Sequence, residues 1–286
     1  MQQLAENGFS PSALGRYINC PLQFYLSTLG RIREPEKFEE VIEATTMGTV
    51  IHNTLEELYT PLLGRFLSAT DINIMMQEAE KCLLKHFEQE YPSGDIRTGK
   101  NLLIFHLLQR YVARFLKNEQ EQLSAWNKEG KQLKLLALEE MFEAFVSVGP
   151  EGSSHTVKIK GKADRIDCLD GINRIIDYKT GRTDSKELAF TEWEALISDS
   201  KNAKSFQLMT YAWLYSQTNS QATQIQAGIA SMRSAEGKLL TLNTPEKEEV
   251  IRPDQLRAFG TQLTQLIREI MDPEVPFTQT KEEDNC

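Results

Sequence analysis

GKADRIDCLDGINRIIDYKTG, residues 161–181, is the stretch of sequence that decides the fold. Apolar and polar side chains alternate on both sides of Asp170-Gly171, and this spacing is typical of β-strands. An Asp-Gly pair between two such runs is a strong signal for a tight hairpin turn. The stretch therefore predicts two antiparallel strands joined directly by a turn.

Three charged side chains are expected to converge on this hairpin. Residues i and i+2 of a strand point to one face, so Asp177 and Lys179 project together, and the turn brings the strand of Asp164 alongside them. Asp and Lys are common on the surface of any hairpin. Asp177, however, follows the apolar pair Ile175-Ile176, and an unpaired carboxylate leaving a buried strand is costly. That cost favours a site, and two carboxylates beside an ammonium group suit Mg²⁺ and phosphate chemistry.

The segments outside the hairpin are mainly helical before residue 130. Ser10 followed by Pro11 predicts the start of a helix, and Pro21 predicts its break near Cys20. Apolar residues recur at helical spacing in further segments, at 43–67, 71–89, 101–126, 203–218 and 253–271, and Pro61 and Gly64 mark a break within the first of them.

The apolar period changes to that of strands near residue 133, and strand-like runs flank the later helices. We expect an α/β fold with a central mixed β-sheet flanked by helices and a long helical N-terminal part. The expected organisation is one domain over residues 1–286, with a mainly helical part at 1–130 and an α/β core at 131–280.

Composition excludes several classes of protein. The chain has 286 residues, of which 40% are hydrophobic and 26% charged, so it is not collagen-like, of low complexity or wholly disordered. No run approaches the 18 or so apolar residues that a transmembrane helix needs, and the N-terminus does not resemble a signal peptide. The expectation is a soluble, cytoplasmic protein without a membrane partner.

Charge is unevenly distributed along the chain. The net charge of −9 argues weakly against a protein that coats nucleic acid nonspecifically, because phosphate binding depends on Lys and Arg. Residues 155–182, in contrast, hold seven basic and four acidic side chains. This basic island includes the predicted hairpin.

Beyond the hairpin, four blocks occur in a fixed order along the chain. They are Ser10-x-Ser12-x-Leu14 through Cys20-Pro21-Leu22-Gln23-Phe24-Tyr25, Gly48-Thr-Val-Ile-His52, Asp164 with Asp177-Tyr178-Lys179, and Gln207-Leu-Met-Thr-Tyr211. In this order and spacing they resemble the PD-(D/E)XK nucleases, specifically the RecB/AddB-like exonuclease branch. The resemblance implies a restriction-endonuclease-like core and a nuclease, most similar to exonucleases, that hydrolyses DNA in recombination and repair.

The resemblance also implies a role for each matching residue. Asp164, Asp177 and the Tyr178 carbonyl would bind Mg²⁺ or Mn²⁺, and His52 would complete the metal site. Lys179 would activate water. The two remaining residues, Gln207 and Tyr211, lie four apart on one helical face and would position the lysine or contact the DNA strand. The implied partners are DNA and a helicase subunit or domain of a helicase–nuclease complex.

The four cysteines show no paired metal-binding spacing. Cys82 and Cys168 are expected to be free thiols. Cys20 and Cys286 resemble two ligands of the iron–sulfur cluster that some members of this branch carry, with further cysteines following in those proteins. The resemblance implies that this sequence is part of a longer protein, and no cluster is expected on this chain alone.

Two other functions fit the same pattern. The domain could be a catalytically inactive scaffold that grips DNA, or a protein-interaction module, which the net charge of −9 would allow. The intact set of Asp164, Asp177 and Lys179 argues against the scaffold, because a scaffold does not need converging metal ligands.

Overall fold

The predicted hairpin forms the centre of the sheet. The computed structural model of the protein describes residues 2–32, 41–92, 98–149, 155–234 and 237–280. Strand β2 (Thr156–Leu169) pairs with β3 (Ile172–Lys179), and Leu169 lies opposite Ile172 at the turn. Asp170 and Gly171 both have positive φ, of 50° and 87°. Positive φ at both central residues is what a two-residue hairpin loop with a type I′ turn requires.

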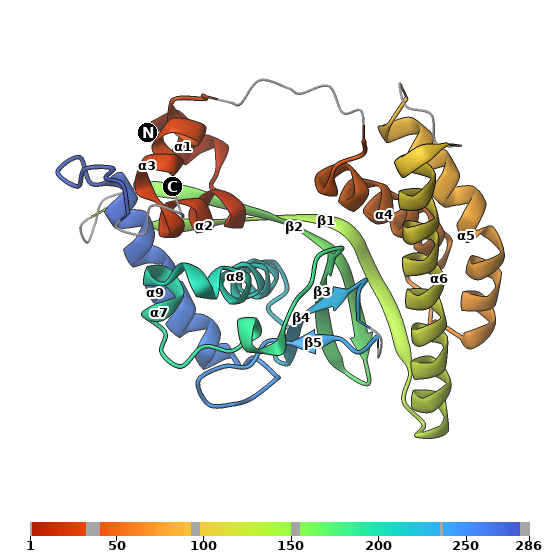
Figure 1. Cartoon of the computed structure of the whole chain (residues 1–286). Coiled ribbons are helices and arrows are strands. Elements are labelled where there is room, and N and C mark those ends of the chain that lie inside the picture. Colours follow the sequence, from red (N-terminus) through yellow and green to blue (C-terminus); the bar gives the residue numbers. More distant parts are fainter. Residues whose placement is uncertain (1, 33–40, 93–97, 150–154, 235–236, 281–286) are drawn as a thin grey trace.

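The sheet has five strands in the order β1-β2-β3-β4-β5. The three other strands are β1 (Leu133–Ser147), β4 (Ile225–Ser231) and β5 (Leu240–Thr241). The β3–β4 pair is parallel, whereas the other three pairs are antiparallel. This mixed sheet with helices on both faces confirms the expected α/β fold (Figure 1).

One face of the sheet packs against the C-terminal helices and the first helices of the chain (Figure 1). The helices on this side are α1 (Gln2–Asn7), α2 (Pro11–Asn19), α3 (Pro21–Phe24), α7 (Ala195–Ser198), α8 (Ala203–Thr218) and α9 (Pro253–Met271). Ile175 of β3 belongs to the apolar core on this side.

The opposite face packs against three helices that follow one another in sequence, α4 (Ala44–Tyr59), α5 (Ala69–Glu90) and α6 (Gly99–Lys128) (Figure 1). Ile176 and Tyr178 belong to the core on this side. Because neighbouring residues of β3 point to opposite faces, both faces of the central strand are buried. Asp177 therefore shares the α8 face with Ile175.

Local sequence signals account for where the helices begin and end. The Ser10 side chain accepts a hydrogen bond from the Ala13 amide and caps α2, and the helix stops at Asn19 before Pro21, as expected. The break expected at Pro61 within 43–67 is present: α4 ends at Tyr59, and a 3₁₀ turn (Thr60–Leu62) containing Pro61 follows. None of the helices in the described ranges is both long and apolar enough to cross a membrane.

Two arginines of the basic island are buried in the protein. Arg165 and Arg174 are buried, with 2% and 6% of their surface exposed, and both contact Asp167. Lys162 pairs with Glu139 and Lys179 with Asp177. Alternation places Arg165 and Asp167 on the face of the sheet toward α6. Arg165 and Arg174 therefore form ion pairs inside the protein.

Candidate active site

The strands β2 and β3 separate at one end, and the candidate site lies at this opening. Their ladder runs from the turn to the pair Arg165–Ile176 and stops there. Beyond this last pair, the Tyr178 amide of β3 donates a hydrogen bond to the Asp164 side-chain oxygen Oδ2 at 2.6 Å. A carboxylate thus takes the place of a backbone acceptor, which fixes Asp164 beside the end of β3.

Asp177 and Lys179 lie together on the α8 face of β3. The Lys179 ammonium is 2.9 Å from Asp177 Oδ2, an atom that accepts no hydrogen bond of good geometry from any described residue. Asp177 has 4% of its surface exposed. Burial raises the pKa of Asp177 to about 6, because the Lys179 charge only partly opposes the effects of desolvation and of the nearby Asp164.

His52 reaches the same point from α4, on the other side of the sheet. Its Nδ1 lies 3.4 Å from Asp164 Oδ1 and its Nε2 lies 3.1 Å from the Tyr178 carbonyl oxygen. The imidazole also packs edge-on against the Tyr178 ring, with 5.8 Å between centroids. Burial alone would lower the pKa of His52, but Asp164 and Glu139 outweigh it and raise the pKa to about 10. In the metal-free protein the imidazole is therefore a cation held between carboxylates.

Glu139 of β1 is a member of the site that the sequence analysis missed. Its Oε1 lies 3.7 Å from His52 Nδ1, and its Oε2 lies 2.5 Å from the Lys162 ammonium. Its φ of 49° is unusual for a residue within a strand, and backbone of this kind is concentrated at functional sites. In the sequence Glu139 is one of two adjacent glutamates in a long strand, and nothing there shows that it faces His52.

Helix α8 supplies an amide and a hydroxyl group behind Asp177. Gln207 Nε2 donates hydrogen bonds to Asp177 Oδ1 at 3.2 Å and to the Tyr211 hydroxyl at 2.9 Å. Gly161 allows this approach, because a Cβ there would lie 2.9 Å from Leu214 Cδ1 and 3.0 Å from the Tyr211 ring. The structure thus brings together all of the residues expected at the nuclease site, namely His52, Asp164, Asp177, Tyr178, Lys179, Gln207 and Tyr211.

The donor set suits a divalent cation that prefers oxygen. Ligand atoms of His52, Glu139 and Asp164 all lie within 4.8 Å of one another. Asp177 and the Tyr178 carbonyl border the same opening. The buried Asp177 Oδ2 and the clustered carboxylates are what a bound cation would neutralise.

The sequence profile of the PD-(D/E)XK nuclease superfamily matches residues 8–286. The chain belongs to this superfamily. A curated relative is an ATP-dependent helicase/deoxyribonuclease subunit of Carboxydothermus hydrogenoformans, which is 28% identical over 202 residues. The match covers 62% of this chain and 16% of that relative, so the chain spans only a small part of the relative's length.

The cysteines expected at an iron–sulfur cluster are only partly described. Cys20 is buried between α2 and α3, and its sulfur accepts a hydrogen bond from the Gln23 amide. Cys286 lies outside the described residues. Cys82 and Cys168 are free thiols, as expected, in α5 and β2. Of the two expected ligands the structure describes Cys20 alone, and its sulfur takes part in a disulfide, so it is not a free thiolate here.

Proposed function

We propose that the protein is a Mg²⁺- or Mn²⁺-dependent deoxyribonuclease that hydrolyses phosphodiester bonds. The convergence of Asp164, Asp177 and Lys179 with His52 at the opened end of the hairpin carries the proposal. Membership of the nuclease superfamily supports it.

Each residue has a role that follows from its position. Asp164, Asp177 and the Tyr178 carbonyl would hold the cation, with His52 completing the set; Glu139 is a further carboxylate within reach. When bound, the cation supplies a water of lowered pKa and neutralises charge that develops on the phosphate. Lys179 holds its ammonium group beside Asp177, where it can orient that water and stabilise the phosphate oxygens.

Gln207 and Tyr211 act behind Asp177. The Gln207 amide holds one Asp177 oxygen, and the Tyr211 hydroxyl accepts from the same amide. This leaves Asp177 Oδ2, which lies 2.9 Å from the Lys179 ammonium, as the oxygen that would bind a cation. We assign both residues to the positioning of the metal-binding carboxylate.

The biological setting belongs to the same proposal. The relative is named as a subunit of an ATP-dependent helicase/deoxyribonuclease. We infer that this chain acts on DNA as an exonuclease in recombination and repair, together with a helicase subunit or domain.

Cleavage assays with purified variants test the proposal. We expect cleavage of linear DNA with Mg²⁺ or Mn²⁺, its loss with EDTA, and a decrease of at least ~10³-fold in Asp177→Ala and Lys179→Ala, as for residues in direct contact with the reaction. Lys117→Ala, which changes an exposed lysine of α6, is the matched control. Closed circular DNA distinguishes an exonuclease from an endonuclease, because an exonuclease needs a free DNA end.

The other outcomes identify the rival functions. Undiminished cleavage in both variants would remove the assignment of the site. DNA binding without cleavage in the wild-type protein indicates a scaffold, and absence of both activities indicates a protein-interaction module.

A further inference from the structure

A second group of ligand-type side chains lies between α4 and α5. Glu57 belongs to α4, and Cys82 and His86 belong to α5. Glu57 follows His52 by five residues, which turns it about 140° around the helix axis. The group therefore lies on a different side of α4 from the nuclease site and shares no residue with it.

The three donor atoms are close enough to share one ion. Cys82 and His86 are four residues apart, so they lie on the same face of α5. His86 Nε2 is 2.7 Å from Glu57 Oε2, and the three ligand atoms all lie within 4.8 Å of one another. The tetrahedral edges of a zinc site with ordinary bond lengths are about 3.3–3.8 Å, so small side-chain rotations are sufficient.

Two of the three side chains are more buried than those of an ordinary surface ion pair, whereas the Glu57 side chain is 43% exposed. Cys82 has 6% of its surface exposed and the His86 side chain 12%. His86 Nδ1 is buried and has no hydrogen-bond partner among the described residues. The other ring nitrogen, Nε2, faces Glu57, so it is the atom of His86 that would bind an ion.

The chemistry of the donors selects the metal. A thiolate, an imidazole and a carboxylate are the three ligand types of zinc sites, whereas Mg²⁺ binds oxygen almost exclusively. We propose that Glu57, Cys82 and His86 bind Zn²⁺ and link α4 to α5. This second site is separate from the nuclease centre and does not depend on the proposed function.

Lys85 competes for the same carboxylate, and its displacement is inexpensive. Its ammonium is 2.7 Å from Glu57 Oε2, but half of the Lys85 side chain is exposed. Exposed ion pairs of this kind contribute little to stability, so the lysine can turn into solvent. The thiol must also lose its proton, as in every thiolate site, which makes binding stronger at higher pH.

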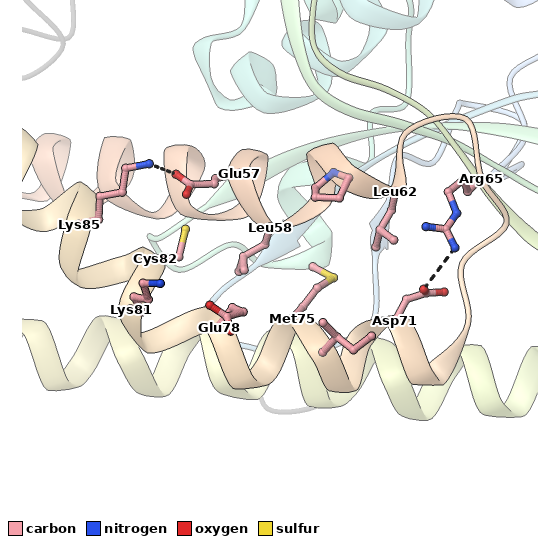
Figure 2. A pocket seen from close by; sticks show the side chains of 12 residues that line it. Glu57, Leu58, Leu62, Arg65, Asp71, Met75, Glu78, Lys81, Cys82 and Lys85 are labelled. Atoms are coloured by element: carbon pink, nitrogen blue, oxygen red, sulfur yellow. Dashed lines mark hydrogen bonds and ion pairs between the residues drawn. The ribbon is translucent and has the colours of Figure 1, made fainter.

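The surroundings leave room for a fourth ligand. A cavity of about 670 Å³ opens beside the group, lined by Glu57, Cys82 and Lys85 at one end and by apolar side chains such as Leu58, Leu62 and Met75 (Figure 2). Figure 2 shows the Cys82 sulfur directed toward α4, below Glu57. Water or a small ligand can complete the coordination from this side.

Cobalt substitution tests the site on the full chain. Co²⁺ bound by a thiolate gives a sulfur-to-cobalt charge-transfer band, which a site of oxygen and nitrogen donors cannot produce. We expect this band in the wild-type protein, its loss in Cys82→Ser, and its displacement by one equivalent of Zn²⁺. Zn²⁺ affinity should fall at least ~10-fold in Cys82→Ser and in Glu57→Gln, the loss that even an outer partner of a metal ligand can cause.

Controls separate this site from the other metal and thiol positions. Cys168→Ser changes the other free thiol and should keep the band. Asp164→Asn with Asp177→Asn removes two carboxylate ligands of the candidate nuclease site and should also keep the band. A band that is absent, or that is lost in Cys168→Ser instead of Cys82→Ser, overturns the proposal. Glu57 is exposed, so Glu57→Gln should fold even if Cys82→Ser does not. An unchanged Zn²⁺ affinity in Glu57→Gln would also overturn the proposal.

Discussion

Gln207 connects two side chains of the candidate site, Asp177 and Tyr211, through one amide group. It donates to Asp177 and to the Tyr211 hydroxyl, and so it fixes which Asp177 oxygen remains for Lys179 and a cation. Partners of metal ligands set the orientation and basicity of those ligands, although they do not touch the ion.

We expect Gln207→Ala to lower the cleavage rate about 10- to 100-fold and to raise the Mg²⁺ concentration needed for half-maximal activity, because Asp177 loses its orienting donor. Rates measured over a Mg²⁺ titration check both effects. Gln217→Ala, at the exposed end of the same helix, is the control and should match the wild-type protein. An unchanged Mg²⁺ requirement in Gln207→Ala would show that the amide does not position the ligand.

The buried charge of Asp177 predicts a dependence of stability on pH in the absence of metal. Burial raises the pKa of Asp177 from 3.8 to about 6, so between these values the unfolded chain ionises while the folded protein keeps its proton. Folding stability therefore falls as the pH rises from about 4 to 6. In EDTA, Asp177→Asn should remove this loss and stabilise the protein at pH 7 by roughly 2–3 kcal/mol, with little effect at pH 4.

Thermal unfolding of both proteins at the two pH values measures the effect. Asp170→Asn, an exposed position in the turn of the same hairpin, is the matched control. Equal stabilisation by Asp177→Asn at both pH values would contradict the titration argument, because a packing effect does not depend on pH.

At the level of elements, the hairpin and its pairing could be predicted from the sequence, whereas the neighbouring strands could be predicted only as strands and not in their register. Alternation and Asp-Gly determine β2 and β3 locally, so the meeting of Asp164 with Asp177 follows from the turn. Glu139 comes from β1, whose pairing with β2 passes through a register shift between Leu135 and Ala137. A shift of one residue reverses the face of every later side chain, and no local pattern reveals where it occurs.

The buried ion pair between α6 and β2 could not be predicted from the sequence either, because it joins two elements that are distant along the chain. Glu119 of α6 is 8% exposed and lies 2.7 Å from the Arg165 guanidinium. The Tyr59 hydroxyl donates to Glu119, and the Tyr59 ring lies under Arg165 at 4.6 Å. Sequence alone shows only charged residues in a helix and a strand, so it places Arg165 in a basic island.

Helix α6 provides a comparison between a buried and an exposed glutamate. We expect Glu119→Ala to destabilise the protein by about 3–5 kcal/mol, because it leaves the buried Arg165 without a main partner. Glu121→Ala breaks the exposed Lys117–Glu121 pair two positions along and should cost less than ~0.5 kcal/mol. Chemical denaturation of both variants gives the two free energies. Similar values would mean that Asp167 alone compensates Arg165.

At the level of the whole molecule, the first and last parts of the described chain contact each other. The Tyr17 hydroxyl of α2 donates to Glu269 of α9 at 2.9 Å, and the Phe277 ring packs edge-on against Tyr17. The Leu22 amide donates to the Thr278 carbonyl at 3.2 Å. The segment after α9 therefore runs beside α3, the short helix that Cys20 caps.

This arrangement bears on the iron–sulfur cluster that the resemblance implies. A longer form of the protein with further cysteines after Cys286 should bind a cluster through Cys20, because the segment leading toward Cys286 already passes α3. Such a link closes a loop of nearly the whole chain, so it should also raise the unfolding temperature by restricting the unfolded state. Iron content, the visible absorption spectrum and thermal unfolding of anaerobically purified protein measure these effects. Cys20→Ser should lose the iron and the added stability together, whereas Cys168→Ser should keep both. Iron retained in Cys20→Ser, or no iron in a longer protein that has the cysteines, would leave Cys20 with a role in packing α2 and α3 alone.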